Sequence, residues 1–542
     1  MNNLPDSNDD ARIRAVLAYH SRTKHHLHRF ATSSGYLDWE TQPDPFRTYA
    51  GAEIVKLPLL SGNLQSKFHD LYVPGAISPA PLDLDSIGIL FELCLGLSAW
   101  KQYQQTRWAL RCNPSSGNLH PTEGYAILPA MPGLNAGGVF HYVSRDHQFE
   151  RRANIESSAL GGDCLLIGLT SIHWREAWKY GERAFRYCQH DMGHAIAAVR
   201  YSAAALGWSA TLLQNASDAS ISDLLGLSHS ESFENVTTHD REHPGALLRV
   251  SPSFSSAVDV EKSQRTLVTS RWTGKANALS SGHVEWPAIE EAADAAWRKD
   301  AEFNATGDRE QSPSALPRVP SQSKASQIIK QRRSAVALDD ITSISAKTFY
   351  EILDRLLPRT GVPPWDVWPW APLVHCGIFV HRVEGLLPGL YLFERSETVH
   401  EKIRAAMAPS FMFEVPEGCP KSLRLFRLAD GDFRQKAQIV SCQQKIAGAG
   451  AFSLGMIAEF DESIYEHGAW WYRRLFWEAG MLGHVLYLEA EAASVRGTGI
   501  GCYFDDVFHD MLGLHGNRFQ SLYHFTMGGP VEDTRLMTHG GY

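Results

Sequence analysis

Hydrophobic residues follow helical spacing in some stretches and strand-like runs in others. In the first half, apolar residues recur at helical spacing over residues 82–100. Short apolar runs bounded by glycine or turn residues come next, and they predict strands at 124–130, 137–144 and 163–172. A long helix with small residues along one face is expected from about 184 to 207.

The second half repeats this order. It predicts a helix at 345–357, strands at 376–383, 389–393 and 450–460, and a long helix at 471–495. The two long helices share a short pattern, because Arg186 is followed by Gly193 and Arg473 by Gly480 at the same spacing. One such match is weak evidence, but a repeated element order favours internal duplication.

Two segments do not follow the repeat. Residues 1–78 mix polar and aromatic residues, which predicts an ordered N-terminal extension with few regular elements. Residues 256–323 are rich in Ser, Pro, Gly and charge, which is typical of an inter-domain linker, with one short helix expected at 287–299. The resulting domains are 79–255 and 324–542.

Composition excludes several classes of protein. The net charge of −9 argues against a nucleic-acid partner, and no basic run marks a phosphate-binding face. The eight cysteines show no C-x-x-C spacing, so we expect reduced core residues. The N-terminus lacks the features of a signal peptide, and no apolar run is long enough to span a bilayer. We therefore expect a cytoplasmic protein with no membrane partner.

The segment RWALRCNPSSGNLHPTEGY, residues 107–125, carries the strongest candidate for ligand binding. Its Pro-Ser-Ser-Gly-Asn turn offers backbone N–H groups, two hydroxyls and an amide within a tight loop. Such a turn allows the close approach of a planar polar ring system. Taken alone, the same composition also fits an ordinary surface turn.

Two other segments suit a phosphate or a closely approaching ligand. The sequence QRRS at 331–334 places two guanidinium groups and a hydroxyl together, which can hold a phosphate, although a solvated helix end is the simpler alternative. The sequence GTGIG at 497–501 lets the backbone approach a ligand, but it is not a dinucleotide fingerprint and also fits a helix-terminating loop.

Two side-chain groups remain as candidates. Lys179 and Tyr180 are adjacent and form a proton acceptor and donor pair if they lie near a substrate, the alternative being ordinary surface side chains. His25, His26 and His28 lie close together in sequence, but no accompanying Cys or carboxylate spacing supports a metal site. We predict no metal.

Together these segments resemble the nitroreductase superfamily, specifically its SagB-type dehydrogenase branch, which includes azoline oxidases. The resemblance covers YHSRTKHHLHRF near the N-terminus, RWALRCNPSSGNLHPTEGY, WKYGERAFRYCQHDMGH and the C-terminal LYHFTMGGPVEDTRLMTHGGY. It implies an α+β sandwich that works as a dimer with FMN at the interface. In that family one protomer supplies an Arg-Arg-Ser element, a glycine loop and a C-terminal basic residue, and the other supplies the Pro-Ser turn.

Applied to this chain, the resemblance divides one set of FMN contacts between the two halves. The first half supplies Arg111, Pro114, Ser115, Ser116 and Asn118. The second half supplies Arg332, Arg333, Ser334, Gly499, Ile500, Gly501 and Arg535. The first half lacks an Arg-Arg-Ser element, and the second half has lost the Ser and Asn of the turn. We therefore expect two tandem nitroreductase-like domains that form an intramolecular pseudo-dimer with one complete FMN site.

The resemblance also implies an activity. Lys179 and Tyr180 match a catalytic Lys-Tyr pair of the azoline dehydrogenases, so we expect two-electron oxidation of a peptide-derived or small heterocyclic substrate, with biosynthetic partner proteins possible. The alternatives are an NAD(P)H-dependent nitro or quinone reductase and a non-catalytic scaffold of a biosynthetic complex. The sequence leaves open whether the chain is a monomer or a homodimer.

Overall fold

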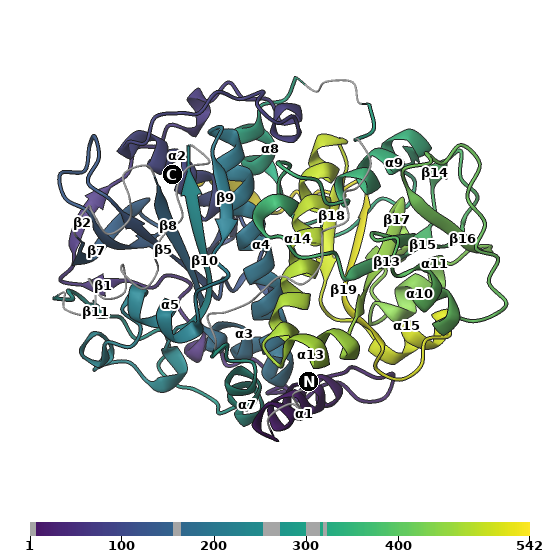
Figure 1. The fold of residues 1–542 in the computed structure, drawn as a ribbon, viewed down its shortest axis with the longest axis horizontal. Helices are drawn as coiled ribbons and strands as arrows, with labels where there is room; N and C mark the ends of the chain where they lie inside the picture. The colour runs from purple at the N-terminus through teal and green to yellow at the C-terminus, as the bar shows by residue number, and fades with distance from the viewer. Residues whose placement is uncertain (1–6, 156–163, 253–270, 300–314, 318–321) are drawn as a thin grey trace, which may run out of the picture.

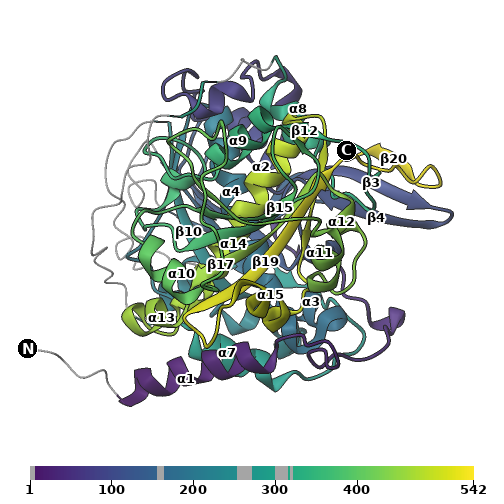
Figure 2. The same ribbon diagram turned by 90° about the vertical axis from the view of Figure 1, so that its right-hand side faces the viewer.

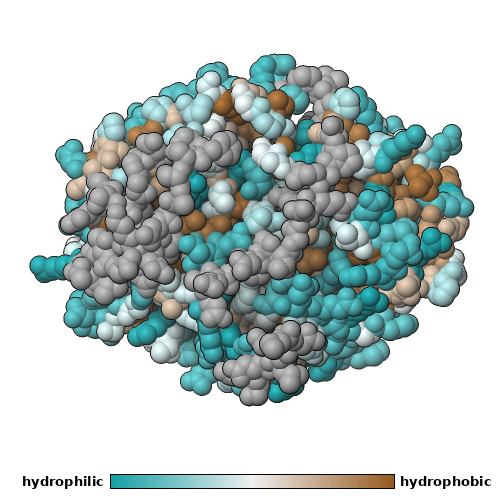
Figure 3. Space-filling model, viewed as in Figure 1, coloured by the Kyte–Doolittle hydropathy of each residue, from teal (hydrophilic) through white to brown (hydrophobic). Residues whose placement is uncertain are grey.

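The computed structural model describes residues 7–155, 164–252, 271–299, 315–317 and 322–542. Two antiparallel sheets lie on either side of two long central helices (Figure 1). In Figure 3 the described part of one face is mainly hydrophilic, with apolar residues in separate small groups. Within the described residues, no helix combines the length and apolar character needed to cross a membrane.

The first sheet belongs to the first half of the chain. Its strands, in spatial order, are β2 (Glu53–Lys56), β7 (Gln148–Asn154), β6 (Gly138–Val143), β5 (Thr122–Leu128), β8 (Leu165–Ser171), β10 (His243–Ser251) and β9 (Ser209–Leu212). Every neighbouring pair is antiparallel. The predicted strands at 124–130, 137–144 and 163–172 correspond to β5, β6 and β8.

The second sheet repeats this arrangement. Its order is β16 (Arg424–Asp430), β15 (Gly389–Glu394), β13 (Val374–Val380), β17 (Phe452–Glu459), β19 (Phe519–Gly528) and β18 (Arg496–Ile500). All of its pairs are antiparallel too. The strands β7, β6, β5, β8, β10 and β9 therefore correspond, in this spatial order, to β16, β15, β13, β17, β19 and β18.

The long helices α4 (Ala184–Ala205) and α14 (Trp471–Ala492) pack against each other between the sheets (Figure 1). They cross at Gly193 and Gly480. A Cβ on Gly193 would lie 2.1 Å from the carbonyl oxygen of Trp477, and one on Gly480 would lie 2.2 Å from that of His190. Only glycine allows the backbones to approach this closely, which explains the shared pattern of the two helices.

Two buried ion pairs join the halves reciprocally. Arg186 of α4 contacts Asp505 at 2.8 Å, and Arg473 of α14 contacts Asp218 at 2.7 Å. Asp218 and Asp505 begin the equivalent helices α5 (Asp218–Leu225) and α15 (Asp505–Leu512). The starts of α4 and α14, of β9 and β18, and of α5 and α15 are all separated by the same number of residues. The two halves therefore have equivalent positions that can be compared residue by residue.

The remaining helices surround this frame. They are α2 (Leu84–Cys94), α3 (His173–Tyr180), α7 (Pro287–Ala295), α8 (Ala325–Gln331), α9 (Ala346–Arg355), α10 (His400–Ala406), α11 (Arg434–Val440), α12 (Ile446–Ala449) and α13 (Asp461–His467). The short strands β1 (Tyr49–Ala50) and β11 (Lys275–Ala276) pair with each other, as do β12 (Ile344–Ser345) and β14 (Val383–Glu384).

The prediction of few regular elements in 1–78 is wrong for its first part. Residues Ser7–Arg22 form α1, which packs against both α7 and α13 and so contacts both halves of the molecule (Figure 2). Within the predicted linker, residues 271–299 pack on the first half through β11 and α7. The stretches 253–270, 300–314 and 318–321 lie outside the described residues.

A third sheet ties the C-terminus to the first half. Strands β3 (Leu97–Tyr103) and β4 (Thr106–Arg111) form a hairpin, and β20 (Met537–Gly540) pairs with β3 (Figure 2). The helix predicted through Trp100 is therefore too long, because α2 ends at Cys94. The hydroxyl of Tyr542 accepts a hydrogen bond from the Leu97 N–H at 2.8 Å. The C-terminal segment thus closes over the junction between the halves.

Candidate functional site

A cavity of about 440 Å³ lies at the junction between the two halves. This volume falls within the roughly 300–1,000 Å³ of small-molecule and cofactor pockets. The first half contributes the turn at 113–118. The second half contributes residues 332–336, the strand and turn at 498–502, and the C-terminal segment around 530–536. Neither half alone encloses the cavity.

Hydrogen bonds to neighbouring residues hold the turn at 113–118 in place. The Asp191 carboxylate accepts hydrogen bonds from the Ser116 N–H at 3.1 Å and from the Ser116 hydroxyl at 3.2 Å. The Ser115 hydroxyl accepts from the His120 N–H at 2.8 Å, and the Asn118 amide donates to the Ala109 carbonyl at 2.7 Å. Burial raises the pKa of Asp191 to about 7, although the serine hydrogen bonds act in the opposite direction. The turn is therefore a rigid wall of the cavity.

Gly117 lies at the tip of this turn with φ +58, in the left-handed region that favours glycine. A Cβ there would lie 2.5 Å from the Tyr180 hydroxyl and 3.2 Å from the Lys179 Nζ. The glycine thus brings the turn into close contact with both members of the predicted catalytic pair.

Arg332 and Arg333 enter the cavity from the end of α8. Arg332 is buried and donates to the carbonyl of Arg111 at 3.0 Å, so it also bridges the two halves. Arg333 is partly buried and donates to the Ser98 hydroxyl at 3.2 Å. Burial, followed by the neighbouring Arg332 charge, lowers the pKa of Arg333 to about 10. Within the described residues, no ion pair joins either guanidinium to a carboxylate. Two cations without a paired anion face one cavity, which is the electrostatic environment of an anion-binding site.

The glycine motif at 497–501 is not a helix-terminating loop, because it forms the edge strand β18. The Tyr487 hydroxyl contacts the Ser334 hydroxyl at 2.9 Å and accepts from the Gly499 N–H at 2.8 Å, so it links this strand to the Arg-Arg-Ser segment. A Cβ on Gly499 would lie 1.8 Å from the Tyr523 hydroxyl oxygen. One on Gly501 would lie 2.4 Å from the ring of Tyr187. Both glycines make room for tyrosines that line the cavity.

All but two of the predicted site residues line this cavity. Those that line it are Arg111, Pro114, Ser115, Ser116, Asn118, Tyr180, Arg332, Arg333, Ser334, Gly499, Ile500 and Gly501. Lys179 lies just behind the turn, next to Gly117. Arg535 does not line the cavity as predicted: its side chain is 72% exposed, and it pairs at 2.8 Å with Asp533, which does line the cavity. Competition from this nearby carboxylate explains the difference.

The cavity also contains aromatic residues and two cations that were not predicted from the sequence. The missed residues that line it include Tyr187, His194, Tyr487, Tyr523, Lys101 and Arg496. Tyr187 and His194 lie seven residues apart on α4, so helical periodicity places them on one face and offered a signal. Arg496 is paired with Glu491 and Glu532, whereas no ion pair among the described residues joins Lys101, Arg332 or Arg333 to a carboxylate.

Tyr180 and Lys179 end α3, and Tyr180 lies near the carboxyl group of Glu176. Burial raises the pKa of Tyr180 well above its ordinary value, and the nearby Glu176 carboxyl adds to the shift. Glu176 is itself buried, and its carboxylate oxygens accept no hydrogen bond from the described residues. Burial, followed by Asp191, raises its pKa as well. Tyr180 therefore keeps its proton at neutral pH and can donate a hydrogen bond.

The equivalent region of the pseudo-dimer is filled. A space of only about 10 Å³ lies beside β9, lined by Trp370, Trp470 and Trp477. The positions equivalent to Gly499 and Gly501 are occupied by Leu212 and Gln214. These side chains and rings remove the room that the glycines of β18 provide.

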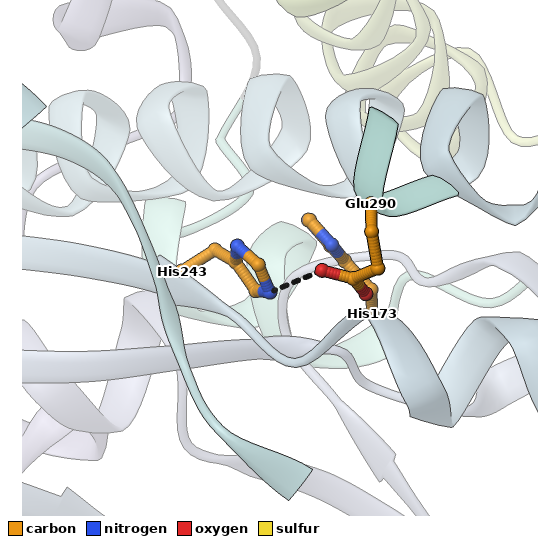
Figure 4. A group of neighbouring side chains, drawn as sticks. All are labelled: His173, His243 and Glu290. Atoms are coloured by element: carbon orange, nitrogen blue, oxygen red, sulfur yellow. Dashed lines mark ion pairs between the residues drawn. The ribbon is translucent and has the colours of Figure 1, made fainter. Parts of the chain in front are cut away.

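A separate cluster of His173, His243 and Glu290 brings three potential metal ligands together (Figure 4). The two imidazole rings are stacked, with centroids 3.9 Å apart and planes inclined by 18°. Since the lone pair of an imidazole nitrogen lies in the ring plane, stacked rings do not direct both lone pairs at one ion. Burial, followed by the Arg473 charge, lowers the pKa of His243 to about 4. The arrangement suits a stacked pair of neutral histidines better than a metal-ligand set.

Comparison with known proteins supports the fold. No protein-family model and no curated protein sequence matches the chain. Among solved structures, 95% of the chain matches 99% of an Anabaena variabilis ATCC 29413 protein provisionally assigned as a nitroreductase, at 20% identity and a TM-score of 0.67. The chain therefore has the nitroreductase fold. The expected architecture, two tandem α+β domains forming an intramolecular pseudo-dimer, is confirmed.

Two weaker matches each cover 38% of the chain. One is to part of the Escherichia coli microcin synthetase McbBCD complex with truncated pro-MccB17 bound, over 70% of that chain, at 15% identity and a TM-score of 0.28. The other is to an Exiguobacterium sibiricum protein provisionally assigned as a nitroreductase, in complex with FMN, over 88% of that chain, at 14% identity and a TM-score of 0.23. Scores this low carry no argument about function.

Proposed function

We propose that this chain is an FMN-dependent oxidoreductase that binds one FMN in the cavity between its halves. The observation that carries the proposal is the pair Arg332 and Arg333, which face the cavity without a carboxylate partner among the described residues. A phosphate monoester has a charge of about −1.5 to −2 at neutral pH and three acceptor oxygens, so it complements two adjacent guanidinium groups.

The rest of the cavity suits a planar ring system. Tyr187 and Tyr523 supply aromatic surface, and the glycines of β18 let these rings pack closely against the strand. The rigid turn at 113–118 forms another wall. The cavity therefore combines guanidinium groups with aromatic rings, as expected for a nucleotide-like cofactor with a phosphate and a flat ring.

The finer proposal is a dehydrogenase or oxidase of the SagB type, acting on a peptide-derived or small heterocyclic substrate. Bound FMN would supply a two-electron acceptor. Tyr180, which keeps its proton, would hold the substrate by a donated hydrogen bond, and Lys179 would take up the proton released on oxidation. The contact of both side chains with Gly117 supports this assignment, because it places them beside the same wall of the cavity. Partner proteins that deliver a peptide substrate belong to this proposal.

The visible spectrum of the purified protein, with flavin identification after release, tests the cofactor. We expect FMN at one equivalent per chain after reconstitution. Two equivalents per chain would contradict the single-site proposal, and no binding at all would favour a non-catalytic scaffold.

Anaerobic mixing with NADPH tests the reaction class. Slow or no bleaching of the flavin is expected of a dehydrogenase that takes electrons from another substrate, whereas rapid bleaching would favour a nitro or quinone reductase. A Lys179→Ala variant with wild-type FMN content should lose turnover of the organic substrate, and a Tyr180→Phe variant should mainly weaken substrate binding. Full turnover by Lys179→Ala would remove that residue from the mechanism.

A further inference from the structure

Cys442 and Cys502 bring two sulfur atoms together at the edge of the cavity. Cys442 lies two residues after the end of α11 and Cys502 two residues after the end of β18, and their Sγ atoms are 2.6 Å apart. Both residues are partly exposed, whereas every other cysteine except Cys419 is buried. The sequence shows no C-x-x-C motif, so only the fold makes this pair visible.

The surroundings of Cys502 favour a thiolate. The hydrogen bond between Cys502 and Cys442 and the hydrogen bond with the His25 ring lower the pKa of Cys502, against the effect of burial. Arg183, which pairs with the buried Asp505, adds positive charge nearby. The same contact raises the pKa of Cys442. One sulfur is thus a nucleophile and the other a protonated partner beside it, the division of roles found in reactive dithiols.

The cavity gives a small molecule access to this nucleophile. Cys502 lines the cavity next to Gly501 and Gln444, and the Gln444 amide donates to the Cys502 carbonyl at 3.1 Å. The Tyr187 hydroxyl donates to the carbonyl of Gly501 at 3.2 Å. These bonds hold the backbone of the nucleophile in place, so the reactive atom has a fixed position at an accessible wall.

We propose that Cys442 and Cys502 form a redox-active dithiol that reduces low-molecular-weight disulfides and closes to an intramolecular disulfide. The Cys502 thiolate attacks one sulfur of the small disulfide and displaces one small thiolate, forming a mixed disulfide. Cys442 then loses its proton and attacks the Cys502 sulfur, which releases the second small thiol. Overall, the two cysteines lose two electrons and two protons, and the small disulfide gains them as two thiols. The exchange needs no flavin, so it stands or falls independently of the proposed cofactor.

Incubation with oxidised and reduced glutathione at set ratios, near pH 7, tests the proposal. Samples are quenched with acid, alkylated and analysed by intact-mass and peptide mass spectrometry. We expect the wild-type protein to lose two alkylatable thiols and to yield one cross-linked peptide pair that joins Cys442 to Cys502. A Cys442→Ser variant lacks the resolving thiol and should retain a glutathione adduct on Cys502.

Cys419 supplies the matched control, because it is partly exposed but has no partner cysteine, and burial raises its pKa to about 11. A Cys419→Ser variant should form the cross-link as the wild type does. In the wild-type protein, iodoacetamide should modify Cys502 at least about tenfold faster than Cys419. The proposal is overturned if no 442–502 cross-link forms under fully oxidising glutathione, or if Cys419 reacts as fast as Cys502. The wild-type cross-link alone decides the matter if a variant fails to fold.

Discussion

Replacing Arg333 with methionine should separate the stability of the apoprotein from its affinity for FMN. In the apoprotein, the Arg333 guanidinium is partly buried beside Arg332, and its pKa is lowered to about 10 from the ordinary 12.5. A shift of this size corresponds to about 3 kcal/mol of destabilisation, or about 1–2 kcal/mol after allowing for solvent screening of the exposed part of the group.

The methionine removes this repulsion but also loses four hydrogen bonds, to the hydroxyl and carbonyl of Ser98 and to the carbonyls of Lys330 and Arg332, which contribute about 1 kcal/mol each. The lost bonds outweigh the relieved repulsion, so the free energy of unfolding of the apoprotein should fall by about 2–3 kcal/mol. FMN binding should weaken in addition, because a charge-assisted hydrogen bond to phosphate contributes about 1.5–3 kcal/mol. That range corresponds to a roughly 10- to 150-fold increase in Kd.

Quenching of flavin fluorescence during titration of the apoprotein measures this Kd, and urea unfolding measures the stability. Riboflavin, which lacks the phosphate, is the decisive second ligand: its affinity should be the same for the wild type and for Arg333→Met. The exposed Arg535, which does not line the cavity, provides the matched control, and Arg535→Met should bind FMN normally. Equal losses for FMN and riboflavin, or a comparable loss in the Arg535 variant, would refute the assignment of Arg333 to the phosphate.

Three further predictions follow from close contacts and burial. Gly499→Ala should weaken FMN binding at least about tenfold, since its Cβ would lie 1.8 Å from the Tyr523 hydroxyl. Adding Tyr523→Phe should restore part of the affinity for FMN. If it restores none, the clash with Tyr523 is not the cause of the loss. Gly480→Ala should lower the free energy of unfolding by about 1–3 kcal/mol in urea titrations, because its Cβ would clash with the backbone of α4. A smaller effect would mean that α4 and α14 are loosely packed where they cross. Burial raises the pKa of Asp191 to about 7 from the ordinary 3.8, so the folded state binds this proton more tightly than the unfolded state does. The resulting stability is complete below pH 4 and declines by up to about 1.4 kcal/mol per pH unit until pH 7. Urea unfolding of wild type and Asp191→Asn between pH 4 and 8 should show a steeper decline in the wild type, and parallel pH profiles would contradict the shift.

Local patterns predicted the repeated core of this fold but not its connections. The strands at 124–130 and 450–460 and both long helices follow hydrophobic periodicity, which reports burial of one face. The β3–β4 hairpin was missed because the apolar residues at 97–100 continue the spacing of the preceding helix. What makes this segment a strand is its pairing with β4 and with β20 at the far end of the chain. A local hydrophobic pattern cannot predict such pairing between distant segments.

The candidate site shows the same division between local and distant information. The predicted residues that line the cavity came from turn chemistry, clustered charge and resemblance, because each acts through properties of its own short segment. The prediction that Arg535 faces the cavity did not hold, because its guanidinium donates to the carboxylate of Asp533, two residues away. Cys442 and Cys502 were predicted to be reduced core residues, but both are partly exposed, and their sequence spacing gives no sign of a pair that only the fold brings together.

The asymmetry of the molecule follows from joining two domains in one chain. In a homodimer, each protomer must carry both the turn and the Arg-Arg-Ser element, and any change that fills one site fills both. Here the halves vary independently, so Leu212 can replace the equivalent of Gly499 without affecting the complete cavity. The filled side buries tryptophan rings, including Trp370 and Trp477, at the junction between the halves. Burial of aromatic surface stabilises that junction more than an empty second pocket would, since a cavity forfeits the contacts of its walls. One side of the junction can therefore contain a cavity for a ligand, because packing on the other side holds the two domains together.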